Sequence, residues 1–238
     1  MNTRALFYPG NLIRLILAGL LGVLIAEGEA AGQAGDSLRL VFHMQQEQAI
    51  YDQSSYGEPP QIAVWLEDSA TGKVRTLFVT RRTARGKYIG KVECPVSLPI
   101  WIGAFRRETG RNDFPTPMQP FFDAVTGATP KTKDITVTAS VEAGRSFNYF
   151  IEMNVAGDYN RAFPKLSASK RPDNHGNGQP SLLFKGTIKS TAGATSKPVC
   201  AGRSHHYYFV TEADPDLAGI DSALQVFRVV SVECTSIP

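Results

Sequence analysis

The segment Asp123-Ala-Val-Thr-Gly-Ala-Thr129 combines an acid, two hydroxyls and small residues within a few positions. It matches the pattern D-x-x-[ST]-G-A-[TS], in which a threonine hydroxyl accepts FMN through a phosphoester bond made by a periplasmic flavin transferase. Gly127 and Ala128 would let a bulky donor approach, and Asp123 could hold magnesium or take the hydroxyl proton. The pattern predicts Thr129 as the acceptor, with Asp123, Thr126, Gly127 and Ala128 as the other cofactor-binding residues.

The same segment has a second interpretation that needs no cofactor. Thr126-Gly127, followed closely by Pro130, is typical of a tight turn made of small residues. Thr129 is therefore either a modified residue or an ordinary loop residue, and the sequence leaves both open.

Basic residues are concentrated ahead of this segment. Residues 73–111 contain ten lysines and arginines but two acids, whereas the net charge of the whole chain is +3. Arginines from this stretch would hold the phosphate of FMN, or the stretch is a solvated basic face without a ligand. The small net charge argues against nucleic acid or an anionic membrane as a partner.

The rest of the sequence carries no pattern typical of an independent enzyme. It lacks the G-x-S-x-G of serine hydrolases and the glycine-rich loops that hold nucleotide phosphates. His205 and His206 are adjacent, so in a strand they would point to opposite faces; one could bind a metal with Asp214 or Asp216, or both are ordinary histidines. A set of aromatic residues could stack on a sugar or pack in a core, namely Trp65, Trp101, Phe105, Tyr207, Tyr208 and Phe209.

The N-terminal residues have the order of a secretory signal. Two arginines are followed by an uncharged apolar run at residues 15–26 and then by small residues up to Ala31. We expect residues 1–31 to be a cleaved signal peptide and residues 32–238 to be one soluble domain in the periplasm or another extracytoplasmic compartment. The alternative is an uncleaved anchor, although the run is shorter than the ~20 apolar residues that span a bilayer.

The three cysteines, Cys94, Cys200 and Cys234, lie far apart and lack C-x-x-C spacing. This disfavours a zinc site and thioredoxin-like chemistry. In an oxidising compartment we expect one disulfide and one free thiol. We favour the pairing of Cys200 with Cys234, although sequence does not fix the connectivity.

Short apolar runs alternate with turn signals along the predicted domain. Residues 37–45 have the period of two expected of a half-buried strand. Two hairpins are predicted, one from residues 61–67 and 73–80 and one from residues 134–141 and 147–154.

Further strands are predicted at residues 181–188 and 224–232, with short helices only near residues 100–107 and 217–224. Residues 166–180 and 190–198 are predicted to be polar surface loops. Many strands and little helix predict an all-β fold, an antiparallel immunoglobulin-like β-sandwich with long polar loops.

Several segments together resemble a family of predicted periplasmic proteins, the domain of unknown function 2271. They are residues 60–68 (PQIAVWLED), 74–77 (VRTL), 98–101 (LPIW), 123–130 (DAVTGATP), 150–154 (FIEMN), 158–160 (DYN), 178–184 (GQPSLLF) and 216–224 (DLAGIDSAL). Members of that family are encoded beside PepSY-type membrane proteins and flavin transferases. The resemblance implies extracytoplasmic electron transfer, and it supplies no established catalytic residues.

The sequence therefore predicts a soluble periplasmic accessory protein of a membrane-linked redox system, with FMN bound covalently at Thr129 and without independent catalytic activity. A flavin transferase and a PepSY-type membrane protein are its expected partners. The alternative is a binding or scaffolding module of the cell envelope that carries no cofactor.

Overall fold

A computed structural model describes most of the chain after the N-terminal region. The described residues are 37–87, 94–121, 125–127, 134–166, 173, 175–206 and 208–237, with only the backbone for 125–127. The chain divides into two units, Met1–Ala34 and Gly35–Pro238, and every described residue belongs to the second. The predicted signal peptide, residues 1–31, thus lies outside the described residues. Within the described residues, no helix has both the length and the apolar character needed to cross a membrane.

The smaller of two sheets contains four antiparallel strands in the order β5-β1-β10-β8. β1 and its neighbour β5 each bury one face, as expected for strands with a period of two. In β1, for example, Leu40, Phe42 and Met44 are buried, and β5 buries every second residue. The four strands are β1 (Ser37–Gln46), β5 (Asp134–Glu142), β8 (Thr195–Ser196) and β10 (Phe227–Ser236).

The larger sheet has six strands in the order β4-β3-β2-β6-β7-β9. Neighbouring strands are antiparallel, except that the short edge strand β4 runs parallel to β3. The strands are β2 (Gln61–Asp68), β3 (Val74–Thr80), β4 (Val125–Gly127), β6 (Ser146–Asn154), β7 (Leu182–Lys189) and β9 (Val199–Arg203).

The main core lies between the two sheets. Phe42 of the smaller sheet meets Tyr149 of the larger sheet edge to face, with ring centroids 5.6 Å apart, and neither side chain is exposed. Ile62, Ile151 and Val232 belong to the same buried cluster. Burial of these apolar faces is the dominant favourable term in holding the sheets together.

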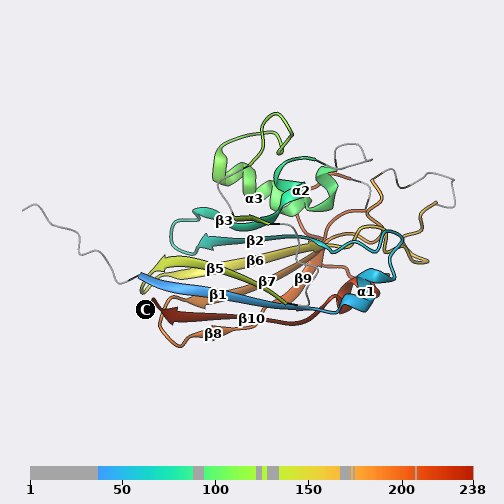
Figure 1. Cartoon of the computed structure of the whole chain (residues 1–238). Helices are drawn as coiled ribbons and strands as arrows, with labels where there is room; N and C mark the ends of the chain where they lie inside the picture. Colours follow the sequence, from blue (N-terminus) through green and yellow to red (C-terminus); the bar gives the residue numbers. More distant parts are fainter. Residues whose placement is uncertain are drawn as a thin grey trace, which may run out of the picture. The chain divides into compact units, whose positions relative to one another are not determined.

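A second core lies on the other face of the larger sheet, under helix α3 (Pro99–Thr109) (Figure 1). Proline at the first position and left-handed Gly110 at the end (φ 71°) match the usual start and stop of a helix. Trp101 and Phe105 of α3 pack with Val79 and Phe121 in this core. The larger sheet is thereby buried on both faces, which explains the nearly continuous burial along β2.

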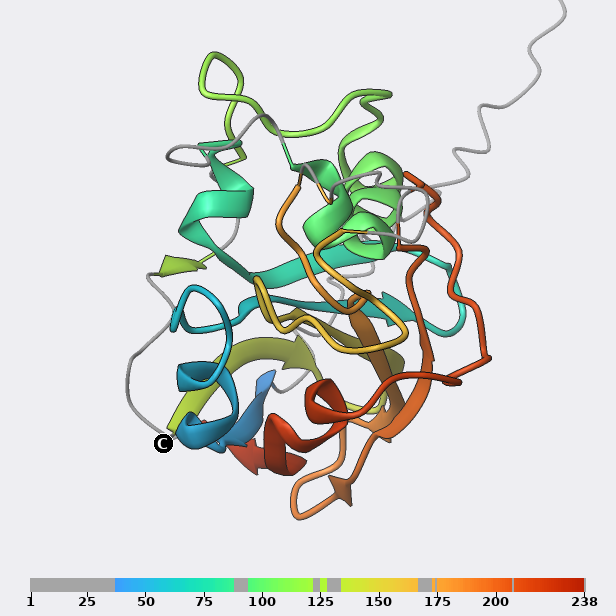
Figure 2. The same cartoon turned by 90° about the vertical axis from the view of Figure 1, so that its right-hand side faces the viewer.

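The remaining helices are short and cover the ends of the sandwich. They are α1 (Gln48–Asp52), α2 (Arg81–Ala84) and the 3₁₀ turns η1 (Pro95–Ser97) and η2 (Ser222–Gln225). Figure 2 shows α1 (blue) beside η2 (red), which are in contact. The helix predicted near residues 100–107 is confirmed by α3. Of the predicted residues 217–224, only 222–224 are helical, as part of the 3₁₀ turn η2. Helices α1, α2 and η1 were not predicted.

The two packed, largely antiparallel sheets with few short helices confirm the predicted all-β sandwich. The hairpin around residues 68–72 is confirmed as β2 and β3, and the strand at residues 37–45 as β1. Residues 190–198, predicted to be a loop, also contain the two-residue strand β8. The immunoglobulin-like character stays a prediction.

The second predicted hairpin is wrong, although both of its strands exist. β5 pairs with β1 in the smaller sheet, and β6 pairs with β2 and β7 in the larger one. The connection at residues 142–145 therefore crosses between sheets. The buried hydroxyl of Ser190 holds it in place by donating to the carbonyl oxygens of Glu142 (2.7 Å) and Arg145 (3.0 Å) and accepting from the Arg145 N–H (2.8 Å).

The substitution Ser190→Ala should lower the free energy of unfolding by about 1–3 kcal/mol, because the Arg145 N–H and the Glu142 carbonyl oxygen of the crossing lose the hydroxyl that they bind. Urea denaturation of the purified protein measures this change. Thr191→Ala, at the exposed neighbouring position, is the matched control and should change the free energy by less than about 0.5 kcal/mol. Equal effects of the two substitutions would contradict the role given to Ser190.

Candidate functional site

The motif segment joins the fold at one edge of the larger sheet. The backbone of β4 runs parallel to β3, with Thr126 opposite Val79 and Gly127 opposite Thr80. Thr126 and Gly127 therefore belong to a short edge strand, which differs from the tight turn that one interpretation of the sequence predicted. The reason is the open edge of β3, which offers backbone partners that a local turn signal does not reveal.

The other predicted site residues, Asp123, Ala128 and Thr129, lie outside the described residues, and so do the side chains of β4. The structure thus gives the path of the chain through Thr126 and Gly127. The role of Thr129 as acceptor stays a prediction.

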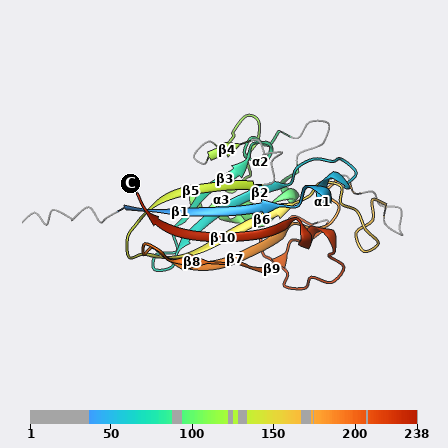
Figure 3. The same cartoon turned by 60° about the horizontal axis from the view of Figure 1, so that its bottom comes forward.

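Helix α2 lies beside β4 and is basic (Figure 3). Thr80, opposite Gly127, is followed directly by the exposed residues Arg81 and Arg82. Arg82 also forms an ion pair with Glu58 at 3.1 Å. Positive charge therefore lies next to the point where the described backbone of the motif ends.

A small hollow of about 300 Å³ lies just after α2. It is lined by Arg85 and Lys87 together with Pro117 and Pro120. Two cations and two rigid rings suit a phosphate or another small anion better than a neutral apolar ligand. The hollow is thus compatible with a small anion.

The rest of the predicted basic stretch is largely engaged within the protein. Arg107 pairs with Glu67, and Arg111 binds both carboxylate oxygens of Asp113 at 2.8 Å. The Arg106 guanidinium stacks over Phe209, 5.1 Å from the ring centroid. These side chains order the surface around α3, so α2 carries the exposed part of the charge nearest to the motif.

A sugar-stacking platform is wrong for the predicted aromatic residues of the larger sheet and α3. Trp65, Trp101 and Phe105 are all buried in the second core. Trp65 stacks on Phe150 with ring centroids 5.1 Å apart. Residue 207 lies outside the described residues, and the exposed Tyr208 and Phe209 do not form a platform with the buried rings.

A metal site at the paired histidines finds no support. The two predicted carboxylates bind Arg203 instead: Asp214 at 3.1 Å and Asp216 at 4.0 Å. His206 packs edge-on against Phe163, and burial lowers its pKa. In the described part of the chain, no three His, Cys, Asp or Glu side chains gather in a way that could hold a metal ion.

The predicted disulfide between Cys200 and Cys234 is wrong in this structure, because both are free thiols. Cys200 lies on β9 of the larger sheet and Cys234 on β10 of the smaller sheet. Burial raises the pKa of both thiols, which makes them poor nucleophiles. Cys94, in contrast, contacts the hydroxyl of Ser97 at 2.9 Å in a buried polar cluster.

Sequence reasoning did not predict the most unusual acid in the fold, Glu152 on β6. Its side chain is completely buried. Its carboxylate accepts hydrogen bonds from the Trp101 N–H (2.6 Å) and the Ser181 hydroxyl (2.6 Å), and a longer one from the Ile100 N–H (3.3 Å). Burial raises its pKa to about 7, although these hydrogen bonds act in the opposite direction.

A second buried acid, Asp158, lies in a hydrogen-bond network centred on Gln179. Asp158 accepts from the Gln179 N–H at 2.8 Å, and Asn154 donates to the Gln179 carbonyl oxygen at 3.1 Å. The Gln179 side chain donates to Ser222 and accepts from the Asp221 N–H. Burial raises the pKa of Asp158 to about 8, and the nearby carboxylates of Asp221 and Asp173 make smaller contributions in the same direction.

These two networks connect segments that the sequence analysis singled out by resemblance. Glu152 joins residues 98–101 to residues 150–154 and 178–184, and Gln179 joins residues 158–160 to residues 216–224. Asn154 bridges the two groups through Gln179. These segments therefore hold one end of the sandwich together, which is a structural role.

The raised pKa of Glu152 predicts that stability falls as pH rises. Between about pH 4.5 and about pH 7 the folded protein keeps a proton on Glu152 that the unfolded chain has released, so the free energy of unfolding decreases across this window, by up to about 3 kcal/mol. Asp158 adds a change of the same sign up to about pH 8.

Urea denaturation at several pH values measures this slope. Glu152→Gln removes the titrating group and should flatten the slope, leaving the part due to Asp158, while Glu142→Gln at an exposed position should leave it unchanged. A slope in Glu152→Gln as steep as in the unsubstituted protein would show that Glu152 does not titrate in this range.

Comparison with known proteins identifies no relative. No family model, no curated protein and no solved structure matches the chain. The resemblance to the domain of unknown function 2271 accordingly stays a prediction from the sequence segments.

Proposed function

We propose that the protein is an exported, soluble accessory protein of a membrane-linked redox system and carries FMN covalently on Thr129. The observation that carries this proposal is the course of β4. It brings the described part of the motif, Val125–Gly127, to the edge of the larger sheet, beside the exposed arginines of α2. A modified hydroxyl needs access for a transferase, and the edge of a sheet next to a basic surface supplies both access and charge for the phosphate.

The proposed modification joins the Thr129 hydroxyl oxygen to the phosphorus of FMN, while the phosphoanhydride bond that links FMN to the rest of a flavin dinucleotide donor breaks and the nucleoside monophosphate leaves. Asp123 takes the hydroxyl proton or helps to hold magnesium, and Gly127 and Ala128 leave space for the donor. Once attached, FMN supplies the capacity to accept and release electrons. The protein supplies the point of attachment for FMN, positive charge near its phosphate, and a fixed position for the flavin.

The residues around β4 have a separate task in this proposal. Arg81 and Arg82 neutralise the phosphate, and Arg85 and Lys87 extend the positive surface along the hollow after α2. The β-sandwich then acts as a rigid carrier. A flavin transferase loads it, and a PepSY-type membrane protein exchanges electrons with it in the periplasm or another extracytoplasmic compartment.

The full-length chain, co-expressed with a periplasmic flavin transferase, should gain the mass of one FMN less one water. Intact-mass spectrometry measures this gain, and flavin fluorescence should stay with the protein after denaturation. Thr129→Ala should abolish both signals, because the acceptor oxygen is lost. Thr132→Ala is the matched control, since it removes a nearby hydroxyl that lies outside the motif, and it should still be loaded.

An unmodified mass beside a transferase that loads a known acceptor would contradict the proposal. Loading of the Thr129→Ala variant would move the modification to another residue. If the mass stays unmodified, the leading interpretation becomes a binding or scaffolding module that carries no cofactor.

A further inference from the structure

A hollow of about 340 Å³ lies where the two sheets meet, at the opposite end of β3 from β4. It is bounded by the turn between β2 and β3 and by the crossing from β5 to β6. The first residue of β1, Ser37, also lines it. This volume is at the lower end of the range of about 300–1,000 Å³ found for small-molecule sites.

Apolar side chains from both sheets contribute to the lining of the hollow. Leu66 of β2 and Val141 of β5 are buried, and Phe147 of β6 is half-buried. Phe147 is the member of this set that offers apolar surface to the hydrocarbon part of a ligand, whereas Leu66 and Val141 belong to the main core.

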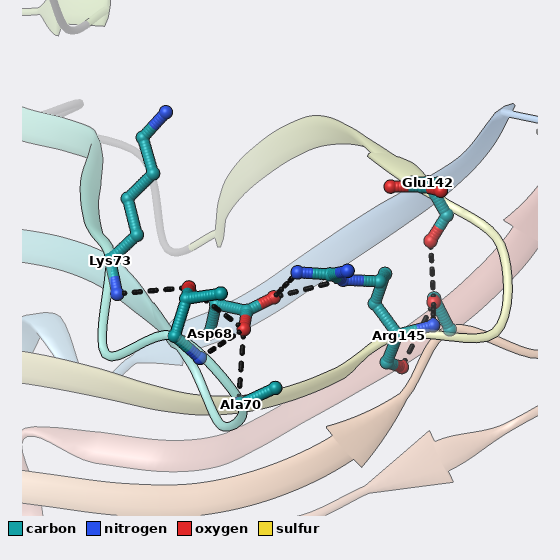
Figure 4. A network of polar contacts seen from close by, with 7 residues as sticks. Asp68, Ala70, Lys73, Glu142 and Arg145 are labelled. Atoms are coloured by element: carbon teal, nitrogen blue, oxygen red, sulfur yellow. Dashed lines mark hydrogen bonds and ion pairs between the residues drawn. The ribbon is translucent and has the colours of Figure 1, made fainter. Parts of the chain in front are cut away.

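One wall of the hollow is fixed by the ion pair between Asp68 and Arg145, shown in Figure 4. Nε and a terminal nitrogen of Arg145 lie 3.0 and 2.7 Å from the same Asp68 oxygen. The other oxygen accepts from the N–H groups of Ala70 and Thr71 and from the Thr71 hydroxyl. Arg145 and these hydrogen bonds lower the pKa of Asp68 to about 2, so the pair stays charged and Arg145 is held in place.

Two further cations line the hollow. A terminal nitrogen of Arg75 donates to the Ser140 carbonyl oxygen at 2.9 Å, which ties β3 to the edge of β5. Lys73 makes no ion pair with any described residue, and its side chain extends from the turn (Figure 4). Asp68 is already neutralised by Arg145, so Glu142 is the single remaining acid among the lining residues, against Lys73 and Arg75.

We propose that this hollow binds a small organic carboxylate, with its apolar part on Phe147 and its carboxylate between Arg75 and Lys73. An anion there gives Lys73 the partner that it lacks and uses the donors of Arg75 that Ser140 does not occupy. Arg145 on the wall of the hollow keeps its hydrogen bonds to Asp68 and does not have to move when the anion binds. The site is separate from the proposed flavin attachment and does not depend on it.

The experiment is a titration of the isotope-labelled mature domain followed by amide NMR, with benzoate and hexanoate as probes. Benzamide and hexanamide are the matched neutral controls. The acids should shift the amide signals of Leu66, Val141 and Phe147, and the amides should bind at least about tenfold more weakly, since a charge-assisted hydrogen bond is worth about 1.5–3 kcal/mol.

Substitutions separate this site from unspecific binding. Lys73→Gln and Arg75→Gln should each weaken benzoate by about tenfold, whereas Lys197→Gln, an exposed lysine outside the hollow, should not change it. Ser140→Tyr, at an exposed lining position, should fill the hollow and abolish the shifts while the remaining spectrum stays folded.

Equal affinity for the acid and its amide would overturn the proposal. So would signal changes away from the hollow, or unchanged affinity in both the Lys73→Gln and Ser140→Tyr variants. If Arg75→Gln unfolds the domain, the Lys73→Gln and Ser140→Tyr variants still show whether benzoate binds in the hollow.

Discussion

One buried carboxylate attaches helix α3 to the outer face of the larger sheet. Glu152 lies between the larger sheet and the start of α3, where two backbone N–H groups of the helix have no partner within the helix itself. Without an acceptor at this point, those groups would be buried and unsatisfied. At the far end of α3, Glu108 accepts from the N–H and hydroxyl of Thr76 on β3. The helix is thus attached to the sheet by an acid at each end, and apolar packing fills the space between.

The sequence predicted those features that depend on local patterns. The period of two along residues 37–45 follows from the position of β1 in a sheet with one buried face, and residues 61–67 and 73–80 pair as the predicted hairpin. The crossing at residues 142–145 could not be predicted, because turn residues look the same whether the next strand pairs or changes sheet. Ser190, far along the chain, decides the outcome here. The buried acids escaped prediction for the same reason, since their partners come from distant segments.

The two ends of β3 have different surroundings, and this organises the surface of the protein. Its C-terminal end leads into the exposed arginines of α2 and pairs with β4. Its N-terminal end follows the turn that Asp68 and Arg145 fix at the junction of the sheets. Of the candidate site, the sequence supplied the motif and the basic stretch. It could not supply the parallel pairing of β4, which depends on an open sheet edge rather than on the residues of β4.

The central pair of the smaller sheet places Leu38 of β1 opposite Ser236 of β10, near the two ends of the described chain. A polypeptide that emerges N-terminus first, from a ribosome or through a membrane pore, therefore exposes β1 long before β10 exists. Until then Leu40 and Phe42 have no sheet neighbour on one side, and the sandwich cannot close. The topology thus delays closure of the smaller sheet until residues 227–236 are available to pair with β1.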